Sequence, residues 1–493
     1  MVSLSATMGQ LRGLTLLGLI PTIRYNSAVS GGARAAIVYT YYRRGAQTDA
    51  ELLGPATPPE RIDWPGLDDL PSSRLGILGT RDANALTFQL NLMGVPNDRL
   101  WITACGLLYL ASFGLYDPHD PAFFALDEAN VADIKQRNPC LRQATFYTVR
   151  SGAPRPYLIA HGCFVVPAAL SPFKHYQLID TQYTPLYVGT PHALRVDYQS
   201  LSGESREVLT GGGFVESFAF GSKAPAQPAA NGFVEVDAPA RPFDLADVSG
   251  TATASYAALY HNFFGDFSPK QIYWPVVPRG VPDSTLFNFG DGGNLEDYGL
   301  IALLQRRVEN AVVFINTSTK LSLSYDPDQP PTLDDIDSNL GPLFGYPNYI
   351  QPNNQVFPTA EWAPLVRTLQ RCKEAGRTLL AVQQLPVLDN DWWGIRGGWT
   401  VRVCWVYNDR VLDWEHLLNE ATGIPEAIRQ GNSKDPSGPF QNFPCYAVTG
   451  QNQAGSLALT PAQINLLADL SCWNVTSNAE VMTSVLTGNA DVR

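Results

Sequence analysis

Two short segments, far apart in the chain, carry a serine and an aspartate beside glycines. Ser30 lies in Ala28–Gly32 (AVSGG), between a strand-like run and a helix-like run, and Asp291 lies in Gly290–Asn294 (GDGGN). A serine at a sharp strand-to-helix turn presents its hydroxyl clear of the backbone, and small flanking residues permit that turn. A carboxylate in contact with the hydroxyl can accept its proton directly. The two segments therefore predict a Ser–Asp pair that attacks acyl esters.

The six histidines of the chain stand in no pattern typical of a serine hydrolase triad. In the order Ser…Asp…His the histidine must follow the acid, and only His416 follows Asp291. His416 lies in an amphipathic helical run, Asp413–Leu418, which favours a surface or packing role. A triad that contains His416 is kept as an alternative, and it predicts His416 within reach of Ser30.

The amides that could stabilise an oxyanion are expected at two places. One is the loop after the first predicted strand, where the N–H groups of Gly9 and Gln10 could donate. The other is the start of the helix that follows Ser30, where Gly31 offers its N–H at the positive end of the helix. Arg12, in the first turn of another predicted helix, could bind a phosphate or carboxylate of the substrate.

The elements that must position these groups follow a β-α-β-α order in the first 45 residues. Val2–Ala6 and Ile23–Val29 have the composition of strands, and helices are predicted from residue 11 or 12 and over Gly31–Tyr42. This alternation implies parallel strands. The sequence therefore predicts an α/β fold, a three-layer α/β/α sandwich with a central, mainly parallel sheet and cap insertions.

One catalytic domain over residues 1–493 is expected, because neither an internal repeat nor a long hinge divides the chain. Its core would be residues 1–45 and 150–320, with a cap or lid at 46–150 and an extension, packed on the core, at 321–493. Further predicted strands are Tyr157–Val166, Gln177–Val188, Ala311–Asn316 and Trp399–Tyr407, and further predicted helices are Tyr298–Arg307, Glu361–Ala375 and Pro461–Leu470.

The composition limits the partners. The net charge of −12 gives no general attraction for nucleic acid or for anionic lipid headgroups. No nucleic-acid partner is therefore expected. Seven widely spaced cysteines without a CxxC pair form neither a zinc pattern nor a disulfide framework. Leu14–Ile20 lacks the flanks of a signal peptide. A cytoplasmic protein is expected, with peripheral membrane contact through apolar cap segments.

Together these segments resemble the patatin and cytosolic phospholipase superfamily, and more closely its cytosolic phospholipase and lysophospholipase branch. In that family an S-G-G-G-x-R loop forms the oxyanion hole, G-x-S-G-[GS] holds the nucleophile, and a D-G-[GA] turn carries the catalytic aspartate. The corresponding stretches are Thr7–Arg12 (TMGQLR), Ala28–Gly32 and Asp291–Asn294. The resemblance covers most of residues 1–320, and Met8 and Gln10 stand where the family has glycines.

The resemblance implies an acyl hydrolase of the phospholipase or lysophospholipase type. Ser30 would be the nucleophile and Asp291 its base, with an acyl-Ser30 intermediate and a lipid or other acyl ester as substrate. Gly9, Gln10 and Gly31 would form the oxyanion hole, and Arg12 would bind the headgroup phosphate. This chemistry requires no metal ion and no cofactor. An acyltransferase that uses the same dyad, and a non-catalytic lipid-binding or scaffold relative with an altered oxyanion loop, are the alternatives.

Overall fold

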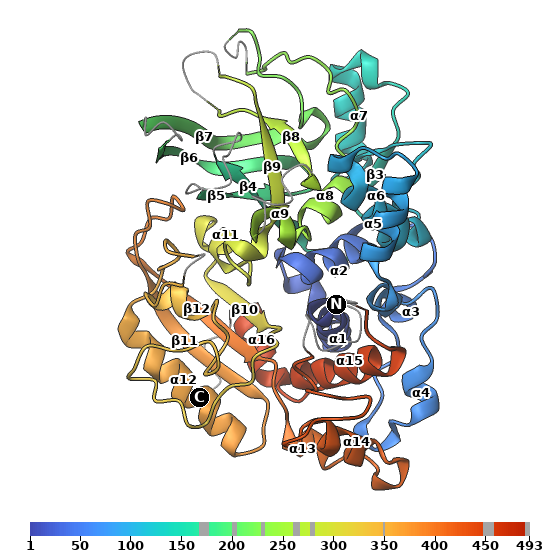
Figure 1. The fold of residues 1–493 in the computed structure, drawn as a ribbon, viewed down its shortest axis with the longest axis vertical. Helices are drawn as coiled ribbons and strands as arrows, with labels where there is room; N and C mark the ends of the chain where they lie inside the picture. The colour runs from blue at the N-terminus through green and yellow to red at the C-terminus, as the bar shows by residue number, and fades with distance from the viewer. Residues whose placement is uncertain are drawn as a thin grey trace. The chain divides into compact units, whose positions relative to one another are not determined.

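The computed structural model describes residues 1–166, 177–199, 205–227, 232–259, 267–276, 282–348, 351–446 and 458–488. The chain forms two compact units (Figure 1). Unit 1 contains Met1–Arg24, Gly45–Asp82 and Leu300–Arg493, and unit 2 contains Tyr25–Arg44 and Ala83–Gly299. Of the expected boundaries, the one at residue 45 coincides with a change of unit, whereas those near residues 150 and 320 fall inside unit 2 and unit 1.

Unit 2 is built around one large, curled sheet. The sheet has seven strands, in the order β7-β6-β5-β4-β9-β8, with β1 also paired to β4. Its strands are β1 (Tyr25–Ala28), β4 (Tyr157–Val166), β5 (Gln177–Tyr183), β6 (Tyr187–Gln199), β7 (Ser205–Glu216), β8 (Lys270–Tyr273) and β9 (Thr285–Asp291). The other elements of the unit are α2 (Ser30–Tyr41), α5 (Ala83–Leu92), α6 (Leu100–Cys105), α7 (Glu128–Arg137), α8 (Leu245–Thr251), α9 (Ser255–Leu259), and the paired strands β2 (Phe123–Ala125) and β3 (Phe146–Thr148).

The predicted central, mainly parallel sheet is wrong. Among the described strands of the large sheet only the β1–β4 pair is parallel, and β4–β5, β4–β9, β5–β6, β6–β7 and β8–β9 are all antiparallel. The prediction extrapolated from the order of elements in the first 45 residues, and the first of those elements is a helix rather than a strand. A single parallel pair beside Ser30 therefore sits within an antiparallel architecture.

Unit 1 holds a three-stranded sheet and two long, buried helices. β10 (Asn310–Ile315) is parallel to β12 (Trp399–Tyr407), which is antiparallel to β11 (Leu379–Val387). The helices are α1 (Val2–Leu16), α3 (Asp49–Leu53), α4 (Trp64–Asp68), α11 (Leu300–Gln305), α12 (Trp362–Glu374), α13 (Leu412–Glu415), α14 (Ile424–Gly431), α15 (Pro461–Thr476) and α16 (Ala479–Thr487). Within the ranges that the structure describes, no helix is long and apolar enough to cross a bilayer.

Helix α1 replaces the predicted strand and loop at the N-terminus. It packs along α15, and Figure 1 shows these helices, from opposite ends of the sequence, side by side. Val2, Leu4 to Ala6 and Met8 to Leu14 are all buried, so the helix shows no exposed polar face. The 3.6-residue periodicity that identifies an amphipathic helix is consequently absent from its sequence.

Elements with strong local signals agree with the prediction. β4 and β12 have the predicted bounds, and β10, α11 and α12 differ from theirs by a few residues. The second predicted strand and the helix after it are β1 and α2. The turn between β1 and α2 is therefore the strand-to-helix turn that was expected to carry Ser30.

Candidate active site

Two strands meet end to end along one edge of β4, and this brings Ser30 and Asp291 together. β1 runs parallel to β4 and ends with Ala28 opposite Ala160. β9 runs antiparallel to β4 and ends with Asp291 opposite Gly162. The carboxyl ends of both strands therefore approach the same place on β4, where the chain continues from β1 into Ser30.

Ser30 and Asp291 are in direct contact. Ser30 Oγ donates a hydrogen bond to Asp291 Oδ2 at 2.7 Å, which is the separation expected of a nucleophile and its base. The second carboxylate oxygen, Oδ1, accepts from the Gly293 N–H at 2.9 Å. One oxygen is thus held by the backbone of its own turn, and this orients the other toward the serine.

The backbone of Ser30 is strained. Its φ is 51°, in the left-handed region that a non-glycine residue adopts at a cost of about 1–3 kcal/mol. Val29 before it is extended, and Ala33 N–H donates the first helical hydrogen bond, to Val29 O. Such strain gathers at functional sites, and a sharp strand-to-helix turn is how a nucleophilic serine is exposed. The amides of Gly31 and Gly32 precede that first helical bond, so they lie at the positive end of α2.

Burial makes the carboxyl of Asp291 a stronger base than usual. Asp291 is 3% exposed, and desolvation raises its pKa to about 6, although the hydrogen bonds from Gly293 and Ser30 act in the opposite direction. The positive charge of Arg34 also favours the ionised form. A pKa near the working pH suits a general base, because the group is then both ionised and basic enough to take a proton.

The two glycines after Asp291 are each required by a close approach, Gly292 to β4 and Gly293 to the side chain of Asp297. A Cβ at Gly292 would lie 2.7 Å from the Cβ of His161, and one at Gly293 would lie 2.7 Å from Asp297 Oδ1. Behind the turn, Cys163 Sγ and the Asn294 side-chain amide both donate to Asp291 O, at 3.2 and 3.1 Å. The glycines were expected to allow approach to the serine, whereas the structure shows that Gly292 lets the turn lie against His161.

Gly9 and Gln10 are not in a loop, so the expected oxyanion loop is corrected. Both lie inside α1, where backbone N–H groups donate to carbonyls four residues back. A Cβ at Gly9 would lie 2.0 Å from Ala468 O, so this glycine permits the close crossing of α1 and α15. The Gln10 amide pairs with that of Asn316 at 2.7 Å, and Met8 is a buried core residue. Of the three expected oxyanion donors, only Gly31 lies at a helix N-terminus.

Arg12 is also engaged within unit 1. Its Nη1 contacts Asp469 Oδ1 at 2.7 Å, and Nε and Nη2 donate to Leu53 O at 3.0 and 2.8 Å. The residue is 4% exposed. These contacts hold α1, α15 and the end of α3 together, and we therefore give Arg12 no role in binding a headgroup.

Three residues beside the dyad were missed by sequence reasoning. Arg34 lies one helical turn after Ser30, with its guanidinium 3.8 Å from the centre of the Tyr109 ring. His161 Nε2 lies 2.8 Å from the hydroxyl of Ser27, which sits three residues before Ser30. The spacing of four residues on a predicted helix could have placed Arg34 near Ser30. Nothing in the local sequence links Ser27 to His161, which is 134 residues away. His416, the histidine of the alternative triad, is an exposed residue of unit 1 at the end of α13.

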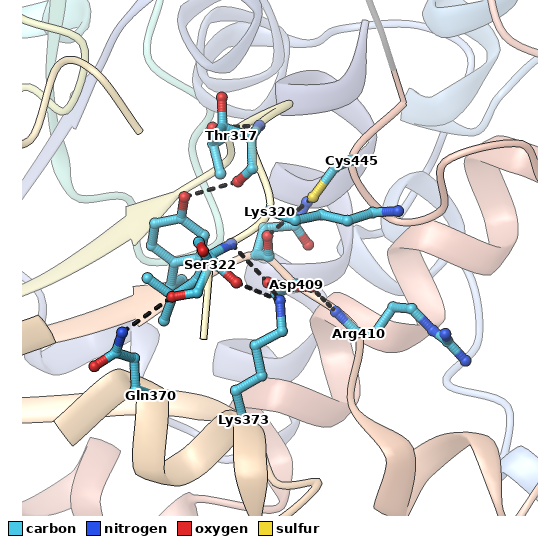
Figure 2. Close-up of polar contacts among 12 residues, drawn as sticks. Thr317, Lys320, Ser322, Gln370, Lys373, Asp409, Arg410 and Cys445 are labelled. Carbon is cyan, nitrogen blue, oxygen red and sulfur yellow. Dashed lines mark hydrogen bonds and ion pairs between the residues drawn. The ribbon is translucent and has the colours of Figure 1, made fainter. Parts of the chain in front are cut away.

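A second polar cluster, in unit 1, has a structural role (Figure 2). It lies where the loops after the parallel strands β10 and β12 meet, a place where α/β proteins often bind ligands. Asp409 Oδ2 accepts from Lys373 Nζ at 2.6 Å and from Leu321 N at 2.9 Å, and Oδ1 accepts from Arg410 N at 2.7 Å. Both oxygens of this buried carboxylate are thus occupied by the chain itself. The cluster fastens the two loops, and we assign it no ligand.

A comparison with protein-family models found no match to this chain, and a comparison with curated proteins found none either. The resemblance to the patatin and cytosolic phospholipase superfamily therefore stays a prediction, and the chemistry of the site is argued from its geometry.

Proposed function

We propose that the protein is a serine acyl hydrolase that cleaves carboxylic esters through an acyl-Ser30 intermediate. The observation that carries the proposal is the 2.7 Å hydrogen bond from Ser30 Oγ to the buried carboxylate of Asp291. The left-handed backbone of Ser30, at a strand-to-helix turn, supports the same assignment.

In the proposed mechanism Asp291 takes the hydroxyl proton as Ser30 Oγ attacks the ester carbonyl. The oxyanion that forms accepts a hydrogen bond from the Gly31 N–H, at the positive end of α2. As the carbon–oxygen bond to the alcohol breaks, the alcohol oxygen takes the proton from Asp291. A water molecule then loses a proton to Asp291 and attacks the acyl group, and the proton returns to Ser30 as the acid leaves.

A lipid is the proposed ester. α5 carries large apolar side chains that are exposed: Phe88 is 68%, Leu92 73% and the adjacent Met93 78% exposed. No charged residue occurs over positions 83–97. A helical segment of this kind can bury its apolar side chains at a lipid surface without electrostatic attraction. It supports peripheral membrane contact as part of the proposal.

Labelling with a fluorophosphonate tests the nucleophile. We expect wild type to bind one probe per chain, and Ser30→Ala to bind none, because the probe reacts with an activated serine hydroxyl. Ser324→Ala, which removes an exposed serine of unit 1, is the control and should label like wild type. Equal labelling of Ser30→Ala and wild type would refute the proposal.

The labelling rate should depend on pH through Asp291. Its pKa is raised to about 6, and only the carboxylate can accept the proton of Ser30. Below about pH 6 the carboxyl is protonated, so the rate should fall about tenfold per pH unit there and level off above about pH 7. The measurement is the second-order rate constant of labelling across this range. A flat profile between about pH 5 and pH 8 would exclude Asp291 as the base.

A further inference from the structure

A chain of three polar side chains, of which two are buried and Ser27 is half-buried, lies behind the junction of β1 and β9. Ser27 Oγ lies 2.8 Å from His161 Nε2, and His161 Nδ1 lies 3.5 Å from Asp180 Oδ1. Asp180 Oδ2 accepts from the Gln182 side-chain amide at 2.9 Å. Ser27 Oγ also donates to Gly299 O at 2.7 Å. The chain thus links β5, β4 and β1 to the end of the segment that begins at Asp291.

Strand geometry places this chain on the face of the sheet opposite the side chain of Asp291. Side chains alternate between faces along a strand, and paired residues share a face. Asp291 pairs with Gly162, which puts His161 on the other face, and His161 shares that face with Ser27, whose partner is Ile159. His161 is the one residue of β4 between the partners of Ala28 and Asp291. It therefore lies at the junction itself.

The hydroxyl of Ser27 connects β1 to the end of the Asp291–Gly299 segment, and these two segments are not paired with each other as strands. A carbonyl oxygen only accepts, so Ser27 donates to Gly299 and accepts from the His161 Nε2–H when both contacts are made. Gly299 ends the segment that starts at Asp291, and a Cβ there would lie 2.6 Å from Ser27 Oγ. The close approach and the two hydrogen bonds tie this segment to the strand that leads into Ser30.

We propose that Ser27, His161 and Asp180 form a positioning relay for the dyad, in which Ser27 holds the Asp291–Gly299 segment at the spacing that Ser30 requires. His161 donates from Nε2 to Ser27, and Ser27 donates to Gly299. Asp180 Oδ1 limits the rotation of the ring by accepting from Nδ1, which requires a hydrogen on both ring nitrogens. The relay touches neither substrate nor reacting atoms. The effect of the relay on the reaction rests on the proposed function, whereas the restraint that Ser27 places on the Asp291–Gly299 segment does not.

Ser27→Ala is the decisive variant, and Ser217→Ala is its matched control. Ser217 is a buried serine of the same unit whose hydroxyl also donates to a backbone carbonyl, that of Phe124 at 2.9 Å. Ser27→Ala should slow fluorophosphonate labelling by about 10- to 100-fold, because small displacements of reacting groups cost that much, with little change in the probe concentration at half saturation. Ser27→Thr and His161→Gln, which keep the donors, should recover labelling to within about threefold of wild type.

Hydrogen–deuterium exchange of the amides of residues 292–299 provides a readout without catalysis. Exchange there should accelerate in Ser27→Ala and stay at the wild-type rate in Ser217→Ala. An exchange rate in Ser27→Ala equal to that of wild type would overturn the relay. Faster exchange in Ser27→Ala together with a labelling rate equal to that of wild type would also overturn it. If wild type itself is not labelled, the proposed function fails, and the exchange comparison still decides whether Ser27 holds this segment.

Discussion

Asp291→Asn is expected to lower the rate constant of acylation by about 10³- to 10⁴-fold while the fold stays intact. Asparagine has the shape of aspartate and can still accept from the Gly293 N–H, so the turn is preserved. It cannot take the proton of Ser30, because an amide oxygen is a very weak base. The loss should therefore appear in the chemical step and leave substrate binding nearly unchanged.

The control for this variant is Asp244→Asn. Asp244 is another buried carboxyl of unit 2, with a pKa raised by burial, and it caps α8. Asparagine is an equally good helix cap, so the unit should fold. Stopped-flow acylation with a chromogenic ester measures both variants. A loss of less than about tenfold in Asp291→Asn would show that another group takes the proton.

Arg12→Met should destabilise unit 1 by about 3–5 kcal/mol, because it leaves the buried carboxyl of Asp469 without its partner. The double variant Arg12→Met/Asp469→Leu should regain most of the loss, since neither charge of this pair then remains in the interior. Thermal unfolding measures both. An unfolding temperature of Arg12→Met equal to that of wild type, together with weaker hydrolysis of phosphate-bearing lipids, would instead return Arg12 to headgroup binding.

The stability that Arg12→Met loses should depend on pH, and the direction follows from the pKa of Asp469. Burial raises the pKa of Asp469 to about 6, above the value of about 3.9 in an unfolded chain. The folded state therefore binds the proton more tightly, and this contribution to stability is present below about pH 3.9 and disappears as the pH rises through about 6. Without Arg12 the pKa rises further, so Arg12→Met should lose more stability at about pH 8 than at about pH 5.

Local sequence signals predicted the elements whose polar and apolar residues are clearly arranged. β4 and β12 were predicted to the residue, and Ser30 and Asp291 were paired correctly because each stands in a recognisable turn. Helix α1 was missed because burial on nearly all sides removes the polar face that reveals a helix. The fold class then failed with it, since the predicted β-α-β-α order depended on that first element.

Contacts between distant residues could not be predicted from spacing. Gly9 has the sequence context of an oxyanion loop, and its role in the helix crossing depends on Ala468, which only the folded chain brings near. The contact of Ser27 with His161 likewise joins residues on two strands whose register no local pattern encodes. Sequence reasoning brought Ser30 and Asp291 together but did not find the residues that hold them.

The meeting of β1 and β9 on β4 has a consequence for how this chain can change. Ser30 and Asp291 are 261 positions apart, yet their spacing depends on the few residues of β4 that run from Ala160 to Gly162. One residue added to or removed from this stretch would move the ends of β1 and β9 relative to each other by about 3.3 Å. It would also turn each side chain of β4 beyond that point to the opposite face of the sheet. Connections elsewhere could lengthen or shorten at small cost. Insertions and deletions among descendants of this sequence should therefore accumulate in its loops and avoid the three positions from Ala160 to Gly162.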